Sequence, residues 1–256
     1  MDIIKRIAPN LPKSIQRPGN ESNEADGIRK RTNHRKLPLP SIILANARSI
    51  NNKVDELDAL VKFHNAYENA SAIAITEIWP SDKIADSHFS INWFNLFRAD
   101  RDTNTTNKSC GGGCLWLIKK NGALTTVHRR FLSSDLELLH IKCRPHYLPR
   151  EINVLNLLAI YIPPDANTKS ATTILEDFVE SAIRKQPDSA TIVVGDFNKP
   201  RLSTSSLYQY VNFNTRENSH LDLCYSNISD ACKPYKLPPL SSTDHAAVQL
   251  VPIYQT

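Results

Sequence analysis

The chain has 256 residues, of which 41% are hydrophobic and 22% charged, an ordinary composition for a globular protein that buries one large core. No apolar run approaches the length that spans a bilayer, and the N-terminus lacks the apolar segment of a signal peptide, so we expect a soluble, intracellular protein with no membrane partner. The five cysteines form no Cys-X-X-Cys pair, and their odd number argues against a disulfide framework, which indicates reduced thiols.

The first 40 residues carry the whole net positive charge of the chain. Residues 1–40 hold nine Lys/Arg and four Asp/Glu, which gives +5, whereas residues 41–256 hold 22 of each sign. This arm is rich in Pro, Asn and Ser and poor in large apolar residues, so we expect it to be disordered. Its run "RKRTNHRK" (29–36) is typical of a nuclear localisation signal or of a segment that binds phosphates weakly, and a solvated linker is an equal alternative. The predicted localisation is the nucleus, or otherwise the cytoplasm.

From residue 41 onward the sequence predicts a single folded domain, 41–256, built mainly from strands. Short apolar runs separated by turns predict the strands, and apolar residues at helical spacing predict two helices, 53–64 and 170–185, the second capped by Ser170. Runs this apolar suit strands that are covered on both faces, which favours a layered α/β domain. The predicted strands are 41–46, 71–77, 113–120, 136–143, 154–161, 191–196, 221–226 and 246–251.

The run of three glycines before one predicted strand is flanked by Cys110 and Cys114. Two cysteines this close raise the alternative of a zinc knuckle, but no Cys or His partner stands at zinc spacing. We therefore interpret them as cysteines at a strand edge.

Polar residues stand where the apolar runs begin or end. In sheets covered on both faces, ligands bind outside the strand ends, so we expect these side chains to meet. Carboxylates and amides without sulfur suit Mg²⁺, which needs one or two carboxylates plus substrate phosphate and leaves the other acids for proton transfer. Each residue alone also has a structural explanation as a turn cap, a hydrogen-bond partner or a core side chain. These residues are Asn46, Glu77, Tyr161, Asp196, Asn198, Asp222, Asp244 and His245.

Seven motifs occur here in the order found in one known family. They are "LANARSI" (44–50), "AITEIW" (74–79), "GGGCLWLIKK" (111–120), "AIYIPP" (159–164), "VVGDFN" (193–198), "TRENSHLDLCYSN" (215–227) and "STDH" (242–245). The region from about residue 41 to the C-terminus resembles the endonuclease domains of non-LTR retrotransposons, within the exonuclease–endonuclease–phosphatase superfamily of deoxyribonuclease I and the apurinic-site endonucleases. The resemblance implies a four-layered α/β sandwich of two packed mixed sheets flanked by helices. It also implies Mg²⁺-dependent hydrolysis of phosphodiester bonds in double-stranded DNA, with Mn²⁺ as a substitute ion.

The resemblance also implies roles for the polar residues around the metal and the water. Glu77 and Asn46 would form the metal pole, with the carboxylate binding the ion and the amide supporting it. Asp196 would orient or deprotonate the attacking water, and Asn198 would hold that carboxylate and the phosphate oxygens. Asp244 would help to hold the metal site.

A second set of implied roles concerns the phosphate. His245 would bind the phosphate and stabilise its developing charge, with Asp222 as the acceptor that orients its ring. Tyr161 and Thr215 would contact the same phosphate. The sequence departs from the family pattern at Thr243, where Ser is usual, and at Ile162, where Arg is common and would offer a phosphate contact.

Three hypotheses about function stay open at this point. The first is a metal-dependent DNA endonuclease, which in retrotransposons nicks the target strand so that the freed 3′-OH primes reverse transcription. The second is a catalytically weak relic that binds nucleic acid, and the third is a phosphoesterase with a substrate other than DNA. In the family a reverse-transcriptase domain usually follows, so the chain is expected to be a fragment, a relic or a domesticated nuclease, with such a domain as its partner.

Overall fold

The structure, a computed structural model, describes residues 39–79, 84–101, 111–146 and 152–253. Residues 1–38 of the basic arm and Cys110 lie outside the described residues, so the predictions for them stay predictions. In the described part, no helix combines the length and the apolar character that crossing a bilayer requires.

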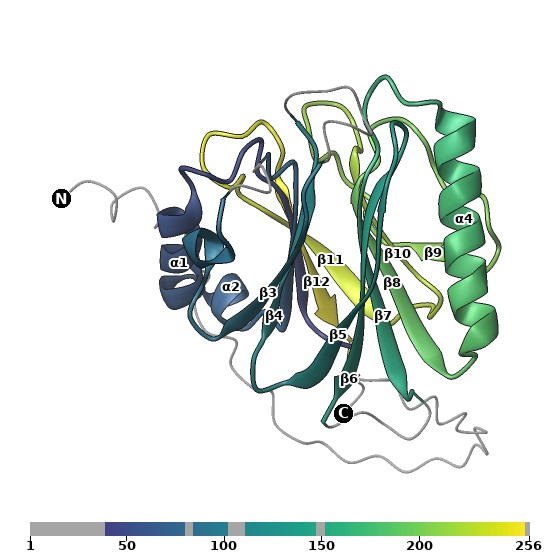
Figure 1. Ribbon diagram of the computed structural model, residues 1–256, viewed down its shortest axis with the longest axis horizontal. Helices are drawn as coiled ribbons and strands as arrows, with labels where there is room; N and C mark the ends of the chain where they lie inside the picture. The colour runs from purple at the N-terminus through teal and green to yellow at the C-terminus, as the bar shows by residue number, and fades with distance from the viewer. Residues whose placement is uncertain (1–38, 80–83, 102–110, 147–151, 254–256) are drawn as a thin grey trace, which may run out of the picture. The chain divides into compact units, whose positions relative to one another are not determined.

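Two six-stranded sheets pack face to face, with helices on their outer faces (Figure 1). Helices α1 (Val54–Phe63) and α2 (Asn65–Glu68) cover the first sheet, α4 (Thr168–Lys185) covers the second, and a 3₁₀ helix, η2, spans Asp86–Phe89. This is the four-layered sandwich that the resemblance implied. The strand order of the first sheet is β11 (Cys232–Leu237), β12 (Ala247–Pro252), β1 (Ile42–Asn46), β2 (Ala72–Thr76), β4 (Cys114–Lys119), β3 (Phe94–Ala99). The strand order of the second sheet is β5 (Ala123–Leu132), β6 (Glu137–Pro145), β7 (Val154–Tyr161), β8 (Ser189–Asp196), β10 (Asp222–Ser226), β9 (Tyr208–Gln209).

The central strands are apolar on both faces because each face meets a different core. In β1, Ile42 and Leu44 point into the core between the sheets, whereas Ile43 and Ala45 pack under α1 with Leu57. Alternate residues of a strand point to opposite faces, so a strand between two cores needs an unbroken apolar run. The continuous apolar runs in the sequence therefore indicate strands that contact a core on both faces.

Each sheet contains one parallel pair, β1 with β2 and β7 with β8, and all other pairs are antiparallel. A parallel pair needs a crossover connection, which α1 and α2 supply in the first sheet and α4 in the second. Because the strands of a parallel pair end at the same edge, four strand ends are available for a site.

The second predicted helix begins earlier than expected, and its cap is a different residue. Helix α4 starts at Thr168, and the side chain of Asn167 accepts a hydrogen bond from the backbone N–H of Ser170. The prediction that Ser170 is the cap is therefore wrong. Asn167 caps the helix because its backbone is still extended, as the backbone of an N-cap residue typically is.

The cysteines of the described part are buried and reduced. Cys114, Cys143, Cys224 and Cys232 are all free thiols within strands. Burial raises the pKa of each thiol, so they behave as small apolar core side chains. Cys114 lies in β4 with its side chain in the core, as expected for a cysteine at a strand edge.

Candidate active site

The carboxyl ends of the two parallel pairs bring four of the predicted residues to one edge of the sandwich. Asn46 ends β1, Glu77 follows β2, Tyr161 ends β7 and Asp196 ends β8. Asp222 begins β10, whose antiparallel register places it directly opposite Asp196. The convergence that the sequence predicted at strand ends is therefore present in the fold.

Asn46 joins the two sheets at this edge. Its Nδ2 donates to Asp196 Oδ2 at 2.9 Å and to Glu77 Oε1 at 3.1 Å, while its Oδ1 accepts from the backbone N–H of Arg48 at 3.0 Å. The amide is buried, and the bond to Asp196 connects residues 150 positions apart. Asn46 thus connects two carboxylates, and its predicted role in supporting a metal ion stays a prediction.

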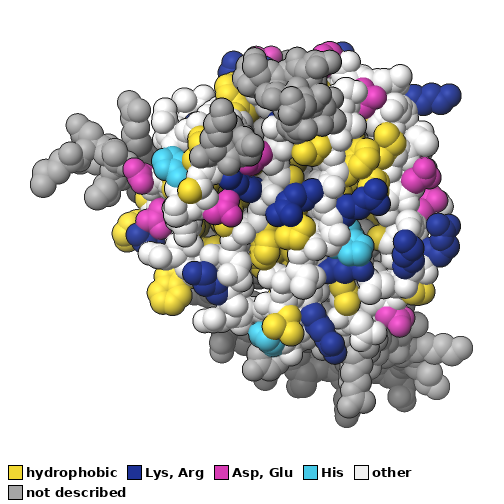
Figure 2. All heavy atoms as spheres, in the orientation of Figure 1, with side chains coloured by type: hydrophobic (Ala, Val, Ile, Leu, Met, Phe, Trp, Pro, Cys, Tyr) yellow, Lys and Arg dark blue, Asp and Glu magenta, His cyan; other side chains and the backbone are white. Residues whose placement is uncertain are grey.

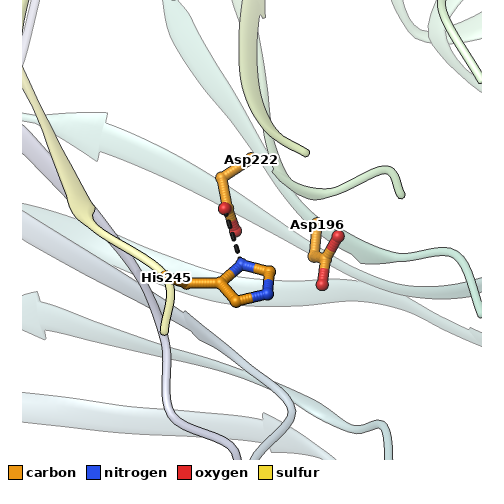
Figure 3. Close-up of side chains that lie close together, drawn as sticks. All are labelled: Asp196, Asp222 and His245. Carbon is orange, nitrogen blue, oxygen red and sulfur yellow. Dashed lines mark hydrogen bonds and ion pairs between the residues drawn. The ribbon is translucent and has the colours of Figure 1, made fainter. Parts of the chain in front are cut away.

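His245 and Asp222 form a buried pair beside Asp196. The imidazole Nδ1–H donates to Asp222 Oδ2 at 2.8 Å, and the two side chains are 5% and 1% exposed. One ligand atom from each of Asp196, Asp222 and His245 lies within 4.8 Å of the others. Figure 3 shows the imidazole between the two carboxylates, with its second ring nitrogen on the side of Asp196. That nitrogen is available for a substrate oxygen.

The surroundings of this group raise the pKa of both Asp196 and His245. Burial, together with the charge of Asp222, raises the pKa of Asp196 well above the ordinary aspartate value. Burial alone would lower the pKa of His245, but its hydrogen bond to Asp222 and the nearby carboxylates raise it above the ordinary histidine value. A carboxylate with a raised pKa is a better base, and a histidine with a raised pKa more readily carries positive charge.

The turn after β8 is held by Asp196 and Asn198 together. Asp196 Oδ1 accepts the backbone N–H of Asn198 at 3.0 Å, and Asn198 Nδ2 donates to the Ile162 carbonyl at 2.7 Å. Asn198 and Glu77 both have left-handed backbones, with φ of 53°. Such conformations cost roughly 1–3 kcal/mol in a non-glycine residue and cluster at functional sites. Asn198 thus orients Asp196, and its predicted phosphate contact stays a prediction.

Thr215 and Thr243 are hydrogen-bonded to the backbone of Asp222 and His245, respectively. The Thr215 hydroxyl oxygen accepts the backbone N–H groups of Leu221 and Asp222, both at 3.1 Å, and the side chain is buried. The structure therefore gives Thr215 a part in placing Asp222, while a phosphate contact stays a prediction. The Thr243 hydroxyl donates to the His245 carbonyl at 3.3 Å.

The reactive edge opens into a cleft of about 440 Å³. Asn46, Glu77, Tyr161, Asp244 and His245 line it. Asp244 stands on its wall, where its Oδ2 pairs with Arg216 Nη2 at 2.7 Å. Burial raises and Arg216 lowers the pKa of Asp244, with a net lowering that keeps it ionised.

Three arginines of the cleft were not predicted as site residues: Arg48, Arg101 and Arg216. Arg48 and Arg216 stand within the quoted motifs "LANARSI" and "TRENSHLDLCYSN", so their signal was present in the sequence. Within the described residues the Arg48 side chain forms no ion pair, and it is exposed in the cleft. Its guanidinium contributes a positive charge to the cleft, whereas Ile162, where Arg is common in the family that the sequence resembles, is fully buried.

Arg101 links the glycine loop to Tyr161. It forms a buried ion pair with Glu137, which also accepts the backbone N–H of Gly113, and its guanidinium lies 5.4 Å from the centre of the Tyr161 ring. Gly112 has a left-handed backbone with φ of 72°, which favours glycine, and a Cβ there would also lie 2.4 Å from the central guanidinium carbon of Arg101. Burial and the nearby carboxylates raise the pKa of Tyr161, so its hydroxyl keeps its proton as a hydrogen-bond donor.

The donors at this edge fit a hard divalent cation. Among the described residues, the carboxylates of Glu77 and Asp244 line the cleft, and in the neighbouring buried group Asp222 Oδ1 has no hydrogen-bond partner. Glu77 keeps its side chain at the cleft with one oxygen held by Asn46. Oxygen ligands with no sulfur suit Mg²⁺ or Mn²⁺.

Comparison with known proteins finds the same fold at low sequence identity. No protein-family model matches the sequence, and no curated protein sequence matches it. Among solved structures, the endonuclease domain of TRAS1, a telomere-specific non-LTR retrotransposon, is 13% identical with a TM-score of 0.59, and the match covers 85% of this chain and 100% of that one.

Two other matches have similar scores. An endonuclease/exonuclease/phosphatase family protein from Leptotrichia buccalis C-1013-b is 12% identical, with a TM-score of 0.59 and coverage of 84% and 100%. Truncated TDP2 from Caenorhabditis elegans is 13% identical, with a TM-score of 0.58 and coverage of 82% and 96%. The chain therefore has the deoxyribonuclease I-like fold of the endonuclease/exonuclease/phosphatase proteins, as the sequence resemblance implied.

Proposed function

We propose that the protein is a Mg²⁺-dependent endonuclease that hydrolyses phosphodiester bonds in DNA. The observation that carries the proposal is the buried group of Asp196, Asp222 and His245, which Asn46 ties to Glu77 at the end of an open cleft. Phosphodiester hydrolysis needs a positioned water, a held phosphate and charge neutralisation, and this group offers a residue for each.

In the proposed reaction, Asp196 accepts a proton from a water molecule as the water oxygen attacks phosphorus. The bond from phosphorus to the 3′ oxygen breaks, and this oxygen takes a proton from bulk water and leaves as a 3′-OH. His245, held as a cation by Asp222, stabilises the negative charge on the phosphate oxygens, and Tyr161 donates to one of them. Glu77, supported by Asn46 and with Asp244 nearby, would hold a Mg²⁺ ion, which when bound neutralises charge on the scissile phosphate.

The substrate assignment rests on the cleft and on the fold neighbours. Arg48 places an exposed positive charge on the cleft wall, which suits a phosphate backbone, while Arg216 is paired with Asp244. One structural neighbour is the endonuclease domain of TRAS1, a retrotransposon, and we extend that role to this chain as a target-nicking domain or a derivative of one. A reverse-transcriptase domain is then the proposed partner.

The deciding experiment is incubation of purified protein with supercoiled plasmid and Mg²⁺. We expect open circles, with Mn²⁺ able to replace Mg²⁺ and EDTA stopping the reaction. Protein with Asp196→Asn is the matched control, since it should bind the plasmid without cutting it. A plasmid that stays supercoiled but is retarded on a gel would favour the nucleic-acid-binding relic, and neither cutting nor retardation would favour a different phosphoester substrate.

The basic arm is proposed as a nuclear address and a loose grip on DNA. Deleting residues 1–40 should weaken DNA binding and flatten its salt dependence by about 0.9 per lost phosphate contact, while cleavage of a short duplex continues. A fluorescent fusion with and without these residues tests the nuclear localisation. If the fusion distributes identically in both forms, the arm is a linker.

A further inference from the structure

A second hollow, of about 340 Å³, lies on the outer face of the second sheet, between α4 and the β5–β6 hairpin. It shares no lining residue with the catalytic cleft. We call it the α4 groove. Its walls include His128, Arg129, His140 and Lys142 from the hairpin and Phe178 and Lys185 from α4.

A β-bulge brings two neighbouring residues of the hairpin to the same wall. The register of β5 against β6 shifts between Val127, which faces Ile141, and Arg129, which faces His140, so His128 is an extra residue. In a regular strand, neighbours point to opposite faces. The bulge redirects the strand, and both His128 and Arg129 therefore line the groove.

The groove is positively charged, although residues 41–256 as a whole are neutral. Arg129, Lys142 and Lys185 line it against a single acid, Asp177. Within the described residues, none of these three cations forms an ion pair. Burial and the charges of Lys142, Lys185 and Arg129 lower the pKa of His128, which is the response expected in a positive potential.

The other acids of α4 are turned away from the groove. Glu176 Oε1 accepts the backbone N–H of Ser203 at 2.7 Å, and Glu180 Oε1 accepts the Thr204 hydroxyl at 3.2 Å. These bonds hold both carboxylates against the loop that follows β8, so they leave the groove cations without neutralising partners. Figure 2 shows Lys and Arg side chains gathered around a histidine on this face of the molecule.

We propose that the α4 groove binds the phosphate backbone of nucleic acid that continues beyond the catalytic cleft. The proposal rests on the proposed DNA substrate. The Arg129 guanidinium lies 4.4 Å from the centre of the Phe178 ring, a contact that orders a phosphate-binding fork before any ligand arrives. Arg129 and Lys185 are exposed, and further exposed cations, Arg144 and Arg184, lie on the same hairpin and helix. A long polyanion reaches such open cations, whereas small-molecule sites enclose most of their ligand.

The distance along the hairpin suits one continuous nucleic acid. Glu137, at the start of β6, faces Tyr161 of the cleft, and Lys142 lies five residues farther along the strand. At roughly 3.4 Å per residue, this separates the two sites by about 17 Å, which is about half of one turn of B-form DNA. A duplex or strand held in the cleft can therefore contact the groove as well.

The test compares two variants that lose the same charge at different places. Lys142→Gln with Lys185→Gln removes two groove cations, and Lys233→Gln with Lys236→Gln removes two exposed cations of β11, in the other sheet. Binding of a labelled duplex of about 30 base pairs is measured by fluorescence anisotropy in EDTA over a range of salt. We expect the groove variant to lose about 1.8 from the slope of log affinity against log salt, since each phosphate contact contributes about 0.9. The β11 variant should keep the slope of the unmodified protein.

Equal slopes for the two variants would overturn the proposal, and thermal unfolding verifies that both are folded. As a second readout, the ring signals of His128 and His140 should shift in NMR spectra when the oligonucleotide is added. A shift with AMP or inorganic phosphate and none with the oligonucleotide would instead assign a small-ligand site and reject the nucleic-acid one. Because binding is measured without metal, a lack of plasmid cleavage would refute the nuclease while leaving the groove result intact.

Discussion

The pair formed by His245 and Asp222 allows a quantitative test of the proposed chemistry. The hydrogen bond is 2.8 Å long, and both side chains are almost fully buried, at 5% and 1% exposure. A hydrogen bond to a charged group contributes roughly 1.5–3 kcal/mol, so Asp222→Asn should slow cleavage by about 10-fold to 150-fold. His245→Ala removes the group that stabilises the phosphate charge, and we expect a loss of about 100-fold to 1,000-fold.

The double variant separates the pair from two independent residues. If Asp222 acts only through His245, the variant with both changes should be within about 2-fold of His245→Ala alone, because coupled residues are not additive. Single-turnover cleavage of a labelled short duplex at saturating enzyme measures this without interference from product release. Asp188→Asn, the same chemical change at an exposed position before β8, is the matched control and should keep full activity. Costs that multiply in the double variant would show that the two residues act separately and would refute the reasoning.

Three further predictions concern the fold and the cleft. Gly195→Ala would place its Cβ 2.0 Å from the Ile160 carbonyl oxygen in the neighbouring parallel strand. We therefore expect the free energy of unfolding, measured in urea, to fall by about 3 kcal/mol or more. Gly122→Ala is the control, because its Cβ would lie 3.8 Å from its nearest contact and should leave stability almost unchanged. Burial lowers the pKa of His140 to about 4, although its hydrogen bond to Asn156 acts in the opposite direction. The folded state therefore binds fewer protons than the unfolded state, and the free energy of unfolding should fall by about 3 kcal/mol as the pH drops from about 6.5 to 4. In His140→Gln this fall should be smaller by the same amount. Unfolding free energies of both proteins across this range measure it, and identical pH profiles would contradict it. Arg48→Gln should reduce kcat/KM on a short duplex by about tenfold and lower the salt slope by about 0.9, while Lys236→Gln changes neither; an unaltered salt slope would mean that Arg48 does not touch the phosphate.

The strands that could be predicted from the sequence are those that are buried on both faces, because their residues are apolar almost throughout. Strand β7 was predicted with the bounds it has, because its residues pack between two apolar layers and are apolar almost throughout. Strand β5 was missed, since it lies at the edge of its sheet, exposes about every second residue, and contains a bulge that breaks the alternation. Strand β11 was also missed, because Pro234 is a poor strand residue that only an edge position accepts.

The site divides in the same way. The sequence alone placed Asn46, Glu77, Asp196 and His245 at the ends of apolar runs, because a polar residue after a buried strand must stand at the edge of a sheet. Only the tertiary structure decided which atoms meet: the bond from Asn46 to Asp196 spans 150 positions and two different sheets. No local pattern encodes such a contact, since it depends on how the two sheets pack. The same holds for the α4 groove, whose charge arises when a helix and a hairpin from separate parts of the chain bring their lysines and arginines together.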